Sequence, residues 1–116
     1  MLTSAMFAIL LVLHADSRHG YAIMHDVETL TEGGVTLGPA TLYRSLQRLR
    51  VDGLIEELDE EVSTHAASDR RAERRRIYRI TTAGRAAARA EADRLSAMVA
   101  AARRVGVLSS TNRHAS

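Results

Sequence analysis

The sequence predicts a mainly α-helical fold with one small β-hairpin and a long C-terminal helix. Three observations predict it. Apolar residues recur at helical spacing in three segments before residue 53, the pattern then changes to the alternation typical of strands, and an Ala-rich run follows over 83–104. With 116 residues, 46% of them hydrophobic, the chain is long enough for one domain with a core and too short for two.

Three helices are expected first. The segment over 2–13 is apolar on nearly all sides, so both of its faces must be covered, which can mean the domain's own core on one face and a second subunit on the other. A second helix is expected over 20–31, with Gly33-Gly34 after it. Pro39 fits the first turn of a third helix, which should run to about Asp52, before Gly53.

A hairpin and a fourth helix should follow. Leu54-Ile55 leads into an acidic stretch over 56–61, and Tyr78 and Ile80 share one face of the second strand, which we expect to be half-buried against the helices. Thr81-Thr82 offers a cap for a helix over 83–104, which is about 30 Å long at the standard rise.

This order of three short helices and a two-stranded hairpin is that of a winged helix-turn-helix domain, in which the third helix enters the major groove of DNA. Leu42, Leu46 and Leu49 should form the buried stripe of the helix over 39–52. Its other face can bind DNA, because Arg bonds guanine, Gln bonds adenine and a helix N-terminus binds phosphate. The candidate DNA-binding residues on this helix are Pro39, Ala40, Thr41, Arg44, Gln47 and Arg48. The alternative is an ordinary solvated face, which also carries Arg and Gln.

Arginines also gather where the hairpin should turn. All 16 basic residues of the chain are Arg, although the net charge is only +2, and the arginines between residues 70 and 76 would form a phosphate clamp. The facing strand carries carboxylates over 56–61, so cross-strand ion pairs are the alternative. We expect a division of roles. The residues expected to contact DNA are Arg70 and Arg71, nearest the tip, and Arg74, whereas Arg76 and Arg79 are expected to pair within the sheet.

The long last helix favours a homodimer. A helix of this length overhangs so small a core, and a seam of small and apolar residues follows one of its faces at alternating steps of four and three. The seam consists of Ala88, Ala92, Leu95, Val99 and Ala102. The alternative is that the helix packs only on its own domain.

Three stretches of the chain together resemble the PadR-like family of transcriptional regulators. They are His19-Gly20-Tyr21-Ala22-Ile23, then Leu37-Gly38-Pro39-Ala40-Thr41-Leu42-Tyr43 with Leu46, Leu49 and Gly53-Leu54-Ile55, and finally Tyr78-Arg79-Ile80-Thr81-Thr82-Ala83-Gly84-Arg85. The resemblance covers about residues 2–104, and the single helix after the hairpin is similar to the family's compact branch. The long hairpin loop and the acidic strand depart from the family's pattern.

This resemblance implies a repressor-like homodimer whose interface joins the last helix to the first helix, with Phe7 and Leu10 contributed by the first. It also implies that Tyr43 touches the DNA backbone and that Tyr21 is a packing residue near Tyr43. Some relatives in this family bind drug-like or phenolic molecules at the dimer centre. The resemblance therefore leaves open whether a small-molecule effector also acts on this protein.

The sequence therefore predicts a sequence-specific DNA-binding regulator. The helix pattern predicts its domain limits, which are a winged helix-turn-helix domain over 1–82, a dimerisation helix over 83–105 and a flexible tail over 106–116. The protein should act as a homodimer on a palindromic operator. The alternative from another class is a winged-helix module that binds a protein instead of DNA.

Catalysis, metals and membranes are not expected. His14, His19 and His25 lack the i, i+4 spacing that puts two ligands on one helix face, and the chain has no Cys. Ser4, Ser17 and Ser45 have no neighbouring base, and no Gly-rich phosphate loop or other cofactor motif is present. The most apolar stretch, over 5–13, is well short of the roughly 20 residues that span a bilayer, so a cytoplasmic location is expected.

Overall fold

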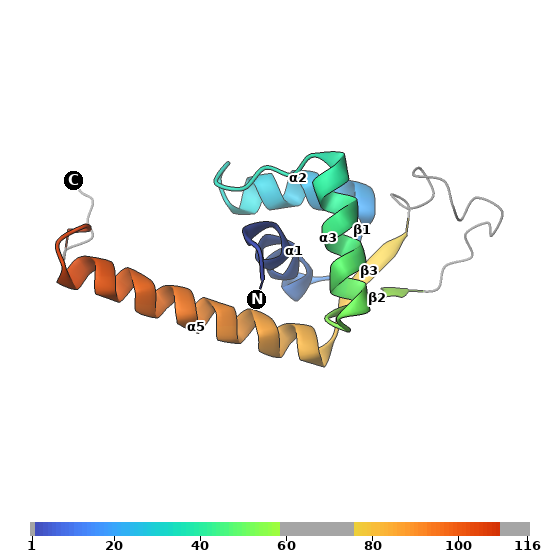
Figure 1. The fold of residues 1–116 in the computed structure, drawn as a ribbon. Coiled ribbons are helices and arrows are strands. Elements are labelled where there is room, and N and C mark those ends of the chain that lie inside the picture. Colours follow the sequence, from blue (N-terminus) through green and yellow to red (C-terminus); the bar gives the residue numbers. More distant parts are fainter. Residues whose placement is uncertain (1, 59–75, 110–116) are drawn as a thin grey trace.

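The chain forms a helical domain with a small sheet at one side and a long helix that extends beyond it (Figure 1). The structure is a computed structural model and describes residues 2–58 and 76–109. In chain order the elements are α1 (Ser4–Ala15), β1 (Arg18–His19), α2 (Gly20–Leu30), α3 (Pro39–Val51), β2 (Ile55–Leu58), β3 (Ile77–Ile80) and α5 (Thr82–Arg104). The predicted fold class, mainly helical with a small β unit, is confirmed.

Within residues 2–58 and 76–109 the sheet has three strands, whereas the sequence predicted two. The strand order is β1-β3-β2, and both pairings are antiparallel. Only two residues, Arg18 and His19, form β1, so no alternating pattern could reveal it. The pairing is extended at one end by a hydrogen bond from the Gly20 amide to the Arg76 carbonyl, 2.8 Å long.

Helix α3 begins and ends where the sequence indicated. Pro39 lies in its first turn, and the helix stops at Val51 because Gly53 adopts a left-handed conformation, with φ +76°. The Gly53 amide donates to the Arg50 carbonyl at 3.0 Å, and the Leu54 amide donates to the Leu49 carbonyl at 2.9 Å. These bonds satisfy the last carbonyls of α3 and direct the chain straight into β2.

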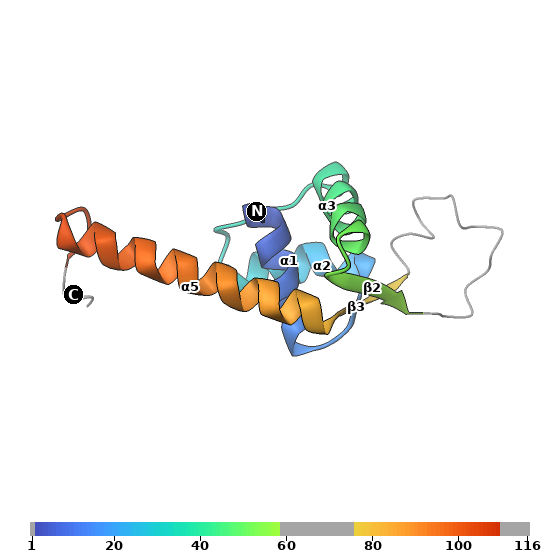
Figure 2. The same cartoon turned by 60° about the horizontal axis from the view of Figure 1, so that its bottom comes forward.

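Helix α1 is the centre of the core. It contacts α2, α3, α5 and β3, and the figures show it between the α2–α3 pair and α5 (Figure 1, Figure 2). Ile9 and Leu10 have no exposed surface, and Leu13 has 1%. The all-round apolar pattern of this segment is therefore explained largely by cover from its own chain.

Helix α5 is fixed to the domain at its first turn. The Thr81 hydroxyl oxygen accepts from the Gly84 amide at 3.0 Å and donates to the Gly53 carbonyl at 2.7 Å. This cap was expected at Thr81-Thr82, and it joins the start of α5 to the turn after α3. Gly84 packs so closely that a Cβ atom there would lie 2.0 Å from the Leu54 carbonyl oxygen. Beyond this joint α5 runs past the rest of the molecule (Figure 1, Figure 2). Among the described residues, no helix has the length and apolar character needed to cross a membrane.

Candidate nucleic-acid interface

Helix α3 separates a buried face from a polar one, as the sequence predicted. Leu42, Leu46 and Leu49 have no exposed surface. Thr41 is half-buried, and the remaining predicted reading residues of the outer face are exposed: Pro39, Ala40, Arg44, Gln47 and Arg48. Since the leucines lock the helix against α1 and β2, the polar face has a fixed direction.

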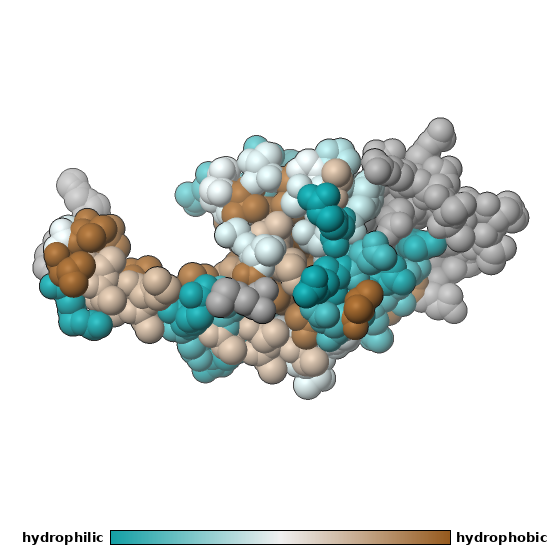
Figure 3. Space-filling model, in the orientation of Figure 1, coloured by the Kyte–Doolittle hydropathy of each residue, from teal (hydrophilic) through white to brown (hydrophobic). Residues whose placement is uncertain are grey.

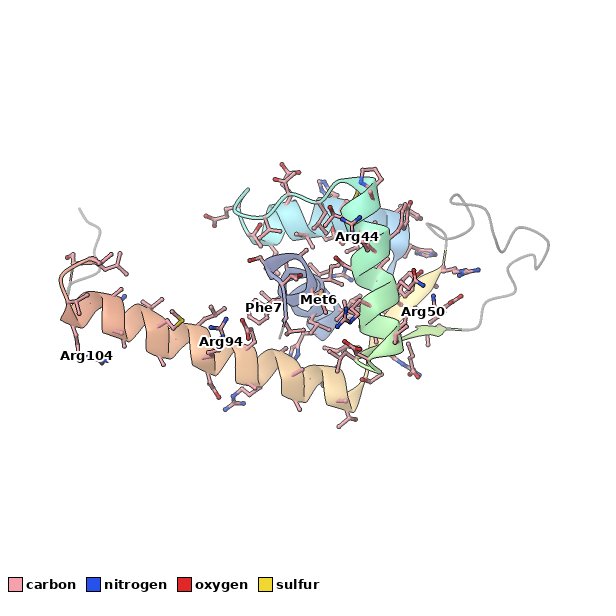
Figure 4. All side chains as sticks on the ribbon, viewed as in Figure 1. Met6, Phe7, Arg44, Arg50, Arg94 and Arg104 are labelled. Atoms are coloured by element: carbon pink, nitrogen blue, oxygen red, sulfur yellow. The ribbon has the colours of Figure 1, made fainter. Side chains whose placement is uncertain are left out.

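The arginines of α3 differ in their partners. Arg48 forms an i, i+4 ion pair with Asp52 at 3.3 Å, which occupies part of its donor capacity. Arg44 forms no ion pair with any residue that the structure describes, and its side chain is exposed. Figure 4 shows Arg44 toward the N-terminal half of α3 and Arg50 in its last turn. Arg44 is therefore the arginine of this face whose guanidinium is most available to an external acceptor.

The two tyrosines from the family resemblance have different surroundings. Tyr43 is half-buried and packs against the core from α3. Tyr21 is 55% exposed, and its ring stacks on that of His19 with centroids 5.2 Å apart. The expectation that Tyr21 is a packing residue is wrong, because its position on α2 points it away from the apolar stripe of Ile23 and Val27.

The strands of the hairpin carry the ion pairs that the sequence predicted. Arg76 lies 3.1 Å from Glu57, and the Arg79 Nε donates to Glu56 at 2.9 Å. The pairing of Arg76 and Arg79 within the sheet is confirmed. The predicted DNA contacts Arg70, Arg71 and Arg74 lie outside the described residues, as do the acidic residues 59–61.

Arg50 is a residue whose position the sequence reasoning missed. It extends from the last turn of α3, and its guanidinium lies 3.8 Å from the same Glu57 carboxylate that Arg76 contacts. A signal was present in the sequence, because the sharp turn at Gly53 brings the strand after it back along the end of the helix. Glu57 therefore connects α3 to the base of the hairpin.

The second half of α5 carries an exposed apolar surface. Leu95 is 37% exposed and Val99 is 40% exposed, while Ala92 is exposed and Ala102 is half-buried. In the space-filling view, hydrophobic residues gather at the far end of this helix (Figure 3). The other large exposed apolar residues of this region are Met98, Val105, Val107 and Leu108.

Two predicted dimer contacts need correction. Leu10 has no exposed surface and Ala88 has 6%, because α1 and the first half of α5 pack against each other within one chain. Neither side chain can reach a partner without opening the core. Phe7 is half-buried and lies on the side of α1 that faces α5, near Arg94 (Figure 4).

A pocket of about 290 Å³ lies where α5 leaves the domain. It is lined by apolar side chains of α1, including Phe7 and Leu11, by Thr31 and Val35, and by residues of α5. Its charged lining is the ion pair of Glu91 and Arg94, whose atoms approach to 2.6 Å. The hydrogen bond from Arg94 lowers the pKa of the Glu91 carboxyl below its ordinary value of 4.5.

The described residues contain no cluster of three or more His, Cys, Asp or Glu side chains that could hold a metal ion. His14 contacts Arg85 through its ring Nδ1 at 3.2 Å, and His19 stacks on Tyr21.

This chain is similar in sequence to one family of known proteins and similar in fold to several solved structures. The model of the Transcriptional regulator PadR-like family matches residues 9–90, which is more than half of the chain. The "Transcriptional regulator Rv3488" of Mycobacterium tuberculosis is 45% identical over 60 residues. That match covers 52% of this chain and 49% of the relative, so it spans about half of the relative's length.

Solved structures share the fold over most of the chain. A transcriptional regulator from Clostridium thermocellum has a TM-score of 0.69 at 22% identity, covering 90% of this chain and 97% of that one. A PadR family transcription regulator from Clostridium difficile has a TM-score of 0.67 at 19% identity, covering 89% and 98%. At such identities the likeness shows the fold, and the family match over residues 9–90 shows the relationship. The chain belongs to the PadR-like family of transcriptional regulators.

Proposed function

We propose that this protein binds DNA sequence-specifically as a homodimer on a palindromic operator, with repression of transcription as its usual effect. The observation that carries the proposal is the outer face of α3, where Arg44 and Gln47 are exposed on a helix whose other face is locked in the core. These two side chains have the donors and acceptors that distinguish guanine and adenine in the major groove.

Binding to DNA is tested with duplexes that the protein itself selects from a random-sequence library. We expect affinity to fall steeply with salt, because arginines release counterions from phosphates, and footprints should show two half-sites about one helical turn apart. R44A should lose roughly 1–3 kcal/mol of discrimination at one base position.

R89A is the matched control, since it removes an exposed arginine from α5 instead of α3. Equal effects of R44A and R89A would show that α3 does not read bases. If the wild-type protein selects no duplex and shows no salt dependence, the interaction-module alternative gains support.

The homodimer rests on the exposed apolar face of α5. Leu95 lies one helical turn before Met98 and Val99, and covering these side chains would remove apolar surface from water. We expect twice the subunit mass in solution at micromolar concentration, and a single-subunit mass for the double variant L95D/V99D with unchanged helical content. Light scattering with circular dichroism measures both. A wild-type protein that stays at the subunit mass would rule out this dimer.

We also propose that a small-molecule effector binds in the pocket beside Phe7. At about 290 Å³ it is close to the lower limit for small-ligand sites, and it adjoins the proposed dimer surface. A compound that raises the melting temperature of the wild type should have no effect on L11W, in which the indole fills the pocket. A compound that stabilises both proteins equally binds elsewhere.

A further inference from the structure

We propose that Glu57 is a positioning residue for DNA recognition, because its carboxylate helps the core packing to hold the angle between α3, the proposed reading helix, and the base of the hairpin. This inference rests on the proposed function of α3 and concerns three residues, Arg50, Glu57 and Arg76, which we call the wing joint. Glu57 does not need to touch DNA for this role.

The wing joint links two elements that are also connected by the turn at Gly53 and by the packing of α3 on β2. Arg50 belongs to the last turn of α3, Glu57 to β2, and Arg76 directly precedes β3. The Glu57 carboxylate lies 3.1 Å from the Arg76 guanidinium and 3.8 Å from that of Arg50. One carboxylate therefore contacts a cation from each side of the joint.

The register of the sheet explains why Glu57 can reach α3. Glu57 pairs with Tyr78, which is fully buried, so both side chains point to the core face of the sheet. Glu56 pairs with Arg79 and points to the opposite face. Adjacent glutamates on one strand thus bind an arginine each, but only Glu57 also contacts the reading helix.

The side chains of the wing joint are less exposed to solvent than those of the neighbouring pair on the same strands. The side chains of Arg76, Glu57 and Arg50 are 19%, 29% and 38% exposed, whereas those of Glu56 and Arg79 are 47% and 54% exposed. Partly desolvated ion pairs are less screened than exposed ones. Without the Glu57 charge, the Arg50 guanidinium would lose the carboxylate that ties it to the strands, and the angle between α3 and the strands would be held less firmly.

A loosened joint affects the two kinds of DNA binding differently. Binding to an operator needs the helix and the hairpin in one geometry at the same time, so a looser joint raises the entropy lost on binding. Non-specific binding depends on charge and tolerates several geometries. The expected signature of a positioning role is therefore reduced discrimination, with no general loss of affinity.

The test compares E57Q with E56Q, which loses the same charge from the neighbouring position of the same strand. The probes are the best duplex selected by the wild type from a random library and a scrambled duplex of the same composition. We expect E57Q to lower the ratio of the two dissociation constants by about fivefold. E56Q should leave that ratio unchanged and bind both duplexes slightly more tightly, because a negative charge near phosphate has gone.

R50Q gives a second, independent variant, because it removes the helix side of the joint and leaves both strands intact. It should lower the ratio as E57Q does, and the double variant R50Q/E57Q should lower it no further than either single change. If E57Q does not fold, as judged by circular dichroism, R50Q decides the question.

Three results would overturn the inference: an unchanged ratio in folded E57Q, an equal loss in E56Q, or an R50Q variant that weakens both duplexes alike. A wild type that prefers no duplex would instead overturn the proposed function. The two failures are therefore distinguishable.

Discussion

The two halves of α5 share one helix and one continuous face, but their surroundings are opposite. Gly84, Ala88 and Glu91 follow each other at steps of four and three, and the same face continues through Leu95 and Ala102. In the first half this face packs against α1, β3 and Leu54. In the second half the residues over 92–99 are all exposed. The difference shows that position relative to α1, not the composition of the helix, decides what α5 buries.

The largest expected effect is at the close approach in the first half. G84A should destabilise the protein by more than about 3 kcal/mol, because its Cβ would overlap the Leu54 carbonyl and force the helix away from the domain. In an ordinary exposed helix the same change would stabilise. Urea unfolding at equilibrium measures the free energy of unfolding.

A97G is the control for this prediction, since Ala97 is exposed in the second half. At this exposed position the ordinary helix propensity of Ala over Gly should hold, so A97G should lower the free energy of unfolding by about 1 kcal/mol. If G84A proves as stable as the wild type, α5 does not need this contact and the two halves differ less than we infer.

A second comparison uses one substitution at two positions four residues apart. A88D should cost roughly 3 kcal/mol or more, because it buries an unpaired carboxylate where Ala88 is 6% exposed. Its cost should not depend on protein concentration. A92D places the same charge on the exposed second half of α5, so the loss of stability should be smaller and should appear through weaker dimerisation.

Thermal unfolding at several protein concentrations, together with the mass in solution, separates these effects. A concentration-dependent loss for A88D, or none for A92D, would contradict the division of α5 into a core half and an interface half.

The smallest effect is expected at the boundary between the halves. Because Arg94 holds the pKa of Glu91 below its ordinary value, the folded protein binds fewer protons at this site than the unfolded chain does. The stabilisation that the pair of Glu91 and Arg94 gives to the folded protein is therefore present at neutral pH. It is lost as pH falls from about 4.5 through the lowered pKa.

The difference in unfolding free energy between wild type and E91Q should accordingly shrink between neutral pH and about pH 3. D93N is the control, because it removes a carboxylate from the same helix whose ion pair with Arg89 is longer, at 3.7 Å. Its effect at neutral pH should be smaller than that of E91Q. If the difference in unfolding free energy between wild type and E91Q stays constant with pH, the ion pair of Glu91 with Arg94 does not form in solution.

Local patterns in the sequence determined most of the elements. Leucines at helical spacing located α3 and its buried stripe, Pro39 and Gly53 set its ends, and Thr81 located the start of α5. The pairs of Arg76 and Arg79 with glutamates were predictable because opposite charges recur on neighbouring strands. Such features depend on residues near each other in the chain or on the two strands of one hairpin, where the pattern of the sequence specifies geometry.

Only the tertiary structure decided the features that depend on which elements meet. It placed Leu10 and Ala88 inside one chain, added β1 to the sheet, and exposed Tyr21. It also brought Arg50 and Arg76 to one carboxylate, although they are far apart in sequence. An apolar residue at helical spacing shows that a face is to be covered, but the covering partner depends on long-range packing, which no local period encodes.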